Sequence, residues 1–121
     1  MSARGESKLE LDDRQIDIIF TNRALAQAEK AMGKSVLAVV NSLASGDAGI
    51  SDLANLLQAG MEAARRDMHS GGRPVTLNDA FDVLDEAGFA DTMTAVVGAV
   101  AAVISSSRHS DDEADSGEKN A

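Results

Sequence analysis

Residues 9–20 read Leu-Glu-Leu-Asp-Asp-Arg-Gln-Ile-Asp-Ile-Ile-Phe, and their pattern sets the first element of the fold. Apolar and polar side chains alternate before and after the segment Asp12-Asp13-Arg14. A period of two residues is typical of a β-strand with one buried face, and a short polar segment between two such runs is typical of a turn. The sequence therefore predicts a β-hairpin. One of its faces must pack on other elements, because a lone hairpin is only marginally stable in water.

After the hairpin, apolar residues recur every three or four positions, which indicates a series of short helices. We expect the first helix to begin at Thr21 or Asn22, whose side chains are good N-caps. It should end at Gly33, and a second short helix at Gly46, because glycine is the usual residue just past a helix. Ser51 is expected to cap the third helix.

Two further helices are expected after a glycine- and proline-containing break. Thr76, with Asp79 three residues later, resembles a capping box. Gly88 should end the fourth helix, and the last should span about residues 90–106. The side chains of the fourth helix that we expect to point inward are Leu77, Phe81 and Leu84.

These patterns give a mainly α (α+β) fold, with an N-terminal β-hairpin followed by about five short helices. Residues 1–7 are small and polar and are expected to form a flexible N-terminus. Residues 8–106 should form the helical domain. Residues 107–121 are polar and acidic without apolar periodicity, so we expect a disordered acidic tail.

Composition excludes several classes of partner and site. The chain of 121 residues has a formal net charge of −9, which disfavours nucleic acid and anionic membrane surfaces as partners. It has no cysteine, which excludes disulfides, thiolate nucleophiles and cysteine-ligated zinc. We expect no secretory signal, because residues 1–7 contain no apolar run. The apolar run at residues 95–104 is shorter than the roughly 20 residues that span a bilayer.

The residues that most often carry chemistry do not gather into a recognisable site. His69 and His109 lie forty residues apart without a second ligand at helical spacing, so we expect no metal site. The carboxylates at residues 82–86 are expected on a solvated helix face. The glycine-rich loop at residues 71–73 lacks the spacing of a phosphate-binding loop, and we expect no cofactor. The sequence thus predicts no catalytic residues and a protein that is not an enzyme.

The segment Ala95–Ile104 is apolar on all sides of its predicted helix. Such a helix must be covered on several sides. It is either a central core helix of the monomer or a contact surface for a second subunit or another protein. The candidate partner-binding residues are Val96, Val97, Ala99, Val100, Ala102 and Val103.

The segment Leu9–Gly33, with its hairpin, helix and glycine, resembles the small tail proteins of gene transfer agents and related siphophages. These proteins are grouped with the tail-assembly chaperones. Their first helix has a Leu-Ala-x-x-Glu pattern followed by glycine. The matching positions here are Leu25, Ala26, Glu29 and Gly33. The segment Val36–Gly46 and the helix after Ser51 also look similar, so that the resemblance covers about residues 8–66.

The resemblance implies a protein without catalytic residues that binds the tape measure protein, or another tail protein, in the host cytoplasm and then leaves the tail. We also expect a homo-oligomer, and the net charge of −9 leads us to expect contact with neither nucleic acid nor membrane. Some relatives carry a tail-tube label, so a structural tail component retained in the virion is the first alternative. A small helical regulatory protein that acts through protein interactions is the second.

Overall fold

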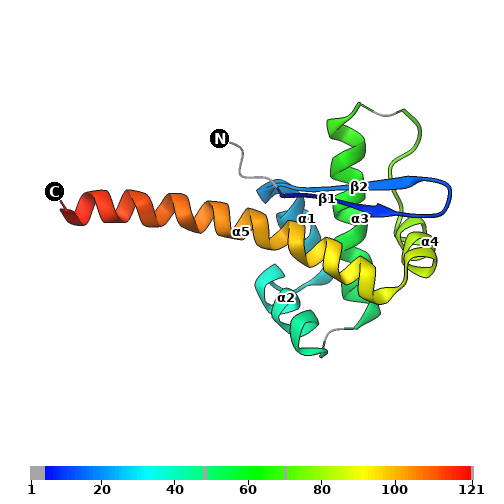
Figure 1. Cartoon of the computed structure of the whole chain (residues 1–121), viewed down its shortest axis with the longest axis horizontal. Helices are drawn as coiled ribbons and strands as arrows, with labels where there is room; N and C mark the ends of the chain where they lie inside the picture. The colour runs from blue at the N-terminus through cyan, green and yellow to red at the C-terminus, as the bar shows by residue number, and fades with distance from the viewer. Residues whose placement is uncertain (1–4, 48, 70, 121) are drawn as a thin grey trace.

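A computed structural model describes residues 5–47, 49–69 and 71–120, with side chains as far as Ser105. In this part of the chain a hairpin precedes five helices (Figure 1), which confirms the predicted mainly α fold. The elements are β1 (Gly5–Glu10), β2 (Gln15–Phe20), α1 (Asn22–Met32), α2 (Val36–Ser45), α3 (Ile50–Asp67), α4 (Leu77–Ala87) and α5 (Phe89–Asn120).

The hairpin forms as the alternation predicted. The strands pair antiparallel from Gly5 opposite Phe20 to Glu10 opposite Gln15. The Leu11 N–H donates to the Arg14 carbonyl at 2.8 Å and closes the loop. Because successive residues point to opposite faces, one face carries the residues that meet the helices. The side chains on this face are Ser7, Leu9, Ile16, Ile18 and Phe20.

Strand β1 begins at Gly5, so residues 5–7, expected in a flexible N-terminus, belong to the sheet. Contacts with α5 explain the difference. The Ser7 hydroxyl donates to the Ala95 carbonyl at 2.8 Å. A Cβ atom at Gly5 would collide with the Ala99 carbonyl oxygen, so glycine allows this close approach. These contacts are tertiary, and the local pattern of a polar N-terminus does not reveal them.

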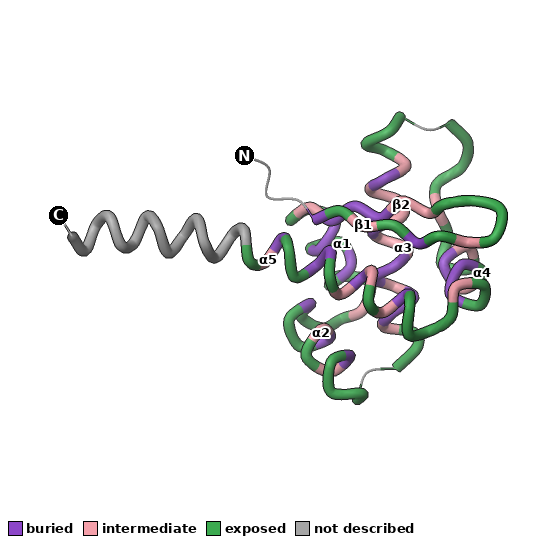
Figure 2. The backbone as a smooth tube through the Cα atoms, viewed as in Figure 1, coloured by how far each residue is buried: buried purple, intermediate pink, exposed green. Residues whose placement is uncertain are grey.

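Helix α3 lies at the centre of the domain and contacts β2, α1, α4 and α5. Its Leu53, Leu56 and Leu57 side chains are fully buried. Figure 2 shows buried stretches along α3. Gly60 faces the hairpin, where Ile18 and Phe20 pack directly against the α3 backbone. The core is therefore mostly aliphatic apart from Phe20, with the hairpin and the other helices arranged around α3.

The ends of the first three helices follow the predicted capping residues with one exception. Thr21 caps α1 by accepting from the Ala24 N–H at 3.1 Å. Gly33 and Gly46 adopt left-handed conformations just past α1 and α2, as expected. The prediction for Ser51 is wrong, because α3 starts at Ile50 with Gly49 as its extended N-cap residue. Glycine is also an acceptable N-cap, and it precedes the serine in the chain.

Helix α4 begins with the predicted capping box. The Thr76 hydroxyl accepts from the Asp79 N–H at 3.1 Å, and the Asp79 carboxylate accepts from the Thr76 N–H at 2.9 Å. The inward face differs from the prediction, because Leu77, the first helical residue, is 39% exposed and Phe81 is only half-buried. The side chains that α4 buries are Ala80, Val83 and Leu84.

Gly88 ends α4 as predicted, and α5 begins at the next residue with its axis turned by 118°. The assigned bounds of α5 continue to Asn120, whereas the sequence indicated an end near residue 106. The expected acidic tail, residues 107–121, falls on positions whose side chains lie outside the described part of the chain, and its disorder stays a prediction.

Candidate partner-binding surface

Helix α5 places the six predicted contact residues on different sides. Four are buried in the core of the domain: Val96, Ala99, Val100 and Val103. Val97 is half-buried, and Ala102 is exposed. The buried four already contact the chain's own core, so in this conformation Ala102 and part of Val97 are the members of the set that another protein can reach. Partner binding by these residues stays a prediction.

The outward side of α5 carries small, uncharged side chains. No charged residue occurs between Asp91 and Arg108. The exposed residues of this side are Thr94, Gly98, Ala101, Ala102 and Ser105. Small side chains allow close approach of another helix or loop, and the absence of charge lowers the cost of removing the surface from water.

Helix α2 extends this uncharged surface, although the sequence analysis did not single it out. None of its ten residues is charged. Its inward side chains join the core, whereas Leu37 is 53% exposed. Further exposed residues of α2 are Ala38, Asn41 and Ala44. The sequence does contain a signal for this surface, namely two long uncharged segments in a chain in which 26% of the residues are charged. By contrast, α1, α3 and α4 all carry charged side chains outward.

A groove connects the two helices. Its volume is about 290 Å³, and Leu25 of α1, Leu37 of α2 and Ile104 of α5 line it. Glu29 also lines the groove, where its carboxylate accepts from the Val36 N–H at 2.8 Å at the start of α2. We call the exposed and half-exposed residues of α2 and of α5 from Val97 to Ser105 the charge-free face, of which Leu37 and Ile104 line the groove. Its members are Leu37, Ala38, Asn41, Ala44, Val97, Gly98, Ala101, Ala102, Ile104 and Ser105. Ala102 lies on the other side of α5 from Ile104, because residues two apart on a helix point about 200° apart.

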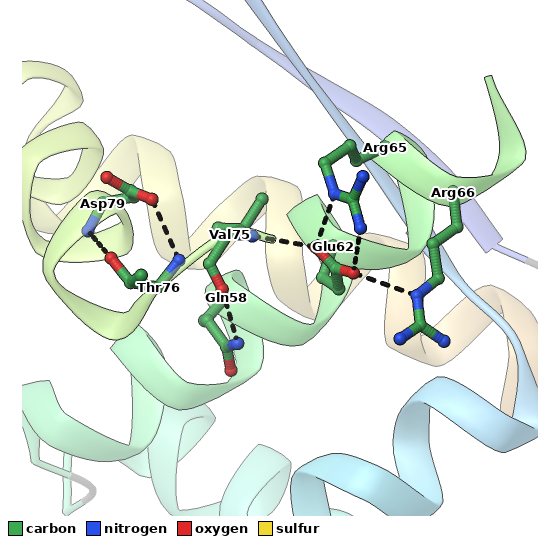
Figure 3. A network of polar contacts seen from close by, with 7 residues as sticks. All are labelled: Gln58, Glu62, Arg65, Arg66, Val75, Thr76 and Asp79. Carbon is green, nitrogen blue, oxygen red and sulfur yellow. Dashed lines mark hydrogen bonds and ion pairs between the residues drawn. The ribbon is translucent and has the colours of Figure 1, made fainter. Parts of the chain in front are cut away.

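A polar network on α3 holds the connection to α4 in place (Figure 3). The Glu62 carboxylate accepts from Arg65 at 2.9 and 2.7 Å, from Arg66 at 2.9 Å and from the Val75 N–H at 2.8 Å. Gln58 donates to the Val75 carbonyl at 3.0 Å. The Arg65 hydrogen bonds, helped by those of Val75 and Arg66 and opposed by burial, lower the pKa of Glu62 from 4.5 to about 2. These hydrogen bonds to the Glu62 carboxylate all come from groups of the chain itself, so the network serves to hold the fold together and does not form a binding site.

The residues considered for chemistry lie at the surface. His69 and the carboxylates at residues 82–86 are exposed, and Glu86 pairs with Arg14 at 3.2 Å. Over the described side chains, no group of three or more His, Asp or Glu residues is placed to hold a metal ion. His109 lies outside that part of the chain. No single described helix is long and apolar enough to cross a membrane, and α4 with α5 passes such a test only as a sharply bent pair.

Comparison with known proteins identifies the class of this chain. A protein-family model matches residues 4–106, which include the hairpin, α1 to α4 and the apolar part of α5. The chain is therefore a phage tail protein. It belongs to the family described as "Phage tail tube protein, GTA-gp10", which confirms the resemblance to gene transfer agent tail proteins and extends it through α5. Searches of curated proteins and of solved structures gave no match.

Proposed function

We propose that this phage tail protein is a tail-assembly chaperone. It binds the tape measure protein in the host cytoplasm while the tail is built, catalyses no reaction, and leaves before the tail is complete. Family membership supports a role in the tail. The observation that carries the proposal is the charge-free face, which leaves a large aliphatic side chain, Leu37, half in water beside the small residues of α5.

The face suits a helical client. An amphipathic helix binds a groove through large apolar side chains spaced three or four residues apart. The groove between Leu25, Leu37 and Ile104 can take such a side chain, while the small, exposed Ala101, next to Ile104 around α5, lets the backbone of the client approach this helix closely. A long client with a repeated apolar stripe offers the same contact many times, so many copies of this small domain can cover it.

The surface favours reversible binding over permanent assembly. Subunits held permanently in a particle usually share interfaces of about 2,000 Å² or more that are rich in apolar side chains. The large exposed hydrophobic residues described here are few, and they come from different elements. These residues are Leu37, Ile50, Met68, Leu77 and Phe89. With a net charge of −9 per chain, closely packed copies also repel one another.

A structural role in the tail tube is the second candidate function, because the family description names a tail tube protein. The two functions differ in where the protein ends up. A tube component remains in the virion in many copies, whereas a chaperone is absent from it. The family match gives no support to the third hypothesis, a small regulatory protein outside the tail.

Two measurements together test the proposal. Co-expression with the tape measure protein of the same phage should keep that protein soluble and yield a complex of the two. Quantitative mass spectrometry of purified mature particles should then find the tape measure protein but not this chain. Stoichiometric amounts of the chain in mature particles would instead establish the tube role. A tape measure protein that is equally insoluble with and without the chain would contradict the chaperone role.

A further inference from the structure

We propose that the groove between α1, α2 and α5 selects a helical segment of its client that carries a lysine or arginine one turn away from a large apolar side chain. The apolar side chain enters the groove, and the cationic group pairs with the Glu29 carboxylate. Because this pairing names the chemistry of the client segment, it deepens the proposed function and rests on it.

Glu29 gives the groove one negative group among uncharged neighbours. Among the described residues that line the groove, Glu29 is the only charged one. The large side chains beside it are apolar, namely Leu25, Leu37 and Ile104. A cation that enters the groove therefore meets a carboxylate and no competing positive charge on its walls. A carboxylate at the same place would be repelled, so the groove distinguishes basic from acidic segments.

One oxygen of the Glu29 carboxylate is available to such a partner. Oε2 accepts from the Val36 N–H at 2.8 Å and so serves the start of α2. The described part of the chain provides no hydrogen bond or ion pair to Oε1, and the residue is exposed. An ionised carboxylate can accept several hydrogen bonds at once. Glu29 can therefore hold the first turn of α2 and a partner's cationic group at the same time.

The spacing along α1 fits two neighbouring side chains of a helical client. Leu25 and Glu29 are four residues apart, so they lie on the same side of α1, about 6 Å apart along its axis. On a client helix that runs along α1, side chains three or four residues apart are separated by about 4.5–6 Å. An apolar side chain over Leu25 therefore places the side chain one turn away over Glu29. The aliphatic stem of lysine or arginine can pack on the groove while its charged group reaches the carboxylate.

The charge of the whole chain favours the same kind of segment. A net charge of −9 attracts basic segments at long range and repels acidic ones. This attraction raises the rate of encounter, whereas the contact with Glu29 fixes which part of the segment enters the groove. The two effects can be separated, because removal of any one carboxylate changes the net charge by the same amount.

Crosslinking from the groove identifies the client segment. A photoreactive benzophenone amino acid is placed at position 37, where the parent leucine is 53% exposed, and the chain is co-expressed with the tape measure protein of the same phage. Mass spectrometry should find crosslinks to segments with a lysine or arginine three or four residues from a large apolar residue. A complex without crosslinks from position 37, or with crosslinks only to segments that lack this pattern, overturns the inference and leaves the chaperone function standing. If no complex forms at all, the chaperone function itself fails.

A double-mutant cycle then tests the pairing of charges. The probe is a synthetic peptide of the crosslinked segment, and fluorescence anisotropy measures its binding to the full chain. Glu29→Gln keeps an oxygen for the Val36 N–H, so the chain should stay folded. It should weaken binding about three- to fivefold, the size expected of an exposed ion pair. Replacement of the peptide's lysine or arginine by glutamine should weaken binding by the same factor, and both changes together by no more than either alone.

Asp85→Asn is the matched control. It also removes one negative charge, but Asp85 is an exposed residue of α4 and does not line the groove. Its effect on peptide binding should stay below about twofold, because salt screens exposed charges that are far apart. Equal losses for Glu29→Gln and Asp85→Asn, or losses in the cycle that simply multiply, would overturn the inference. If Glu29→Gln lowers helicity, the peptide variant alone decides, and equal binding of both peptides to the parent chain would refute the pairing.

Discussion

Gly60 and Gly98 allow a matched test of the packing, because the same substitution should change stability in opposite directions. Both glycines lie inside helices, where alanine is favoured over glycine by about 1 kcal/mol. At Gly60 an added Cβ atom would lie 2.6 Å from Ile18 Cγ2 and 2.9 Å from Phe20 Cζ. At Gly98 an added Cβ atom meets nothing within 4 Å.

The magnitudes follow from these distances. Ile18 and Phe20 are both fully buried, so neither side chain can move aside freely. Overpacking of this kind costs about 1–3 kcal/mol, and it must exceed the helix gain to destabilise the chain. We therefore expect Gly60→Ala to lower the free energy of unfolding by about 1 kcal/mol and Gly98→Ala to raise it by about 1 kcal/mol.

Thermal unfolding followed by circular dichroism measures the difference. For a domain of this size 1 kcal/mol corresponds to roughly 4 °C, so the two variants should melt about 8 °C apart, with the parent between them. Both should be compared at low protein concentration, because Gly98 lies on the charge-free face. A Gly60→Ala variant at least as stable as the parent would refute the close packing of the hairpin on α3.

Three further predictions concern single side chains. The Thr92 hydroxyl is buried without a hydrogen-bond partner among the described residues, so Thr92→Val should stabilise the chain by about 1 kcal/mol in urea unfolding, and a loss of stability would reveal a missed partner. Because the pKa of Glu62 is lowered from 4.5 to about 2, its ionised form contributes stability above pH 4.5 that is lost as the pH falls towards 2. Glu62→Gln should therefore melt below the parent near neutral pH, and the two melting temperatures should converge near pH 2; a constant difference would show that the carboxylate charge is irrelevant. Ala99→Asp should unfold the domain, since Ala99 is buried, whereas Ala102→Asp should stay folded and lose self-association; circular dichroism and light scattering distinguish these outcomes, and a folded Ala99→Asp would contradict the assigned orientation of α5.

Local patterns in the sequence predicted most of the backbone. Alternation around residues 9–20 was sufficient for the hairpin, because one face of each strand is buried and the other carries polar side chains apart from Ile19, which is buried. Glycine placed the ends of α1, α2 and α4, since Gly33, Gly46 and Gly88 all have positive φ values. The early start of β1 was not predictable in this way, because Gly5 is held by contact with Ala99, almost a hundred residues later in the chain.

The candidate site was harder to predict for a physical reason. In a helix that is apolar all round, no side is more hydrophobic than the others, so the sequence does not show which side faces the core. The prediction therefore grouped the buried Val96 and Val100 with the exposed Ala102. Leu37 was not among the candidate residues predicted from the sequence. Its exposure depends on how α2 packs against α1 and α5, and only the assembled domain places it beside Ile104 in one groove.

Protection of single cysteines from labelling tests whether the charge-free face contacts the tape measure protein. The chain has no cysteine, so Ala102→Cys and Leu77→Cys each introduce one thiol, on the face and on charged α4 respectively. Maleimide labelling is compared for the free chain, dilute enough to be monomeric, and for the complex with the tape measure protein. Complex formation should slow labelling at position 102 at least tenfold and leave labelling at position 77 nearly unchanged. Equal labelling of position 102 in the free chain and in the complex would show that the face does not bind the tape measure protein.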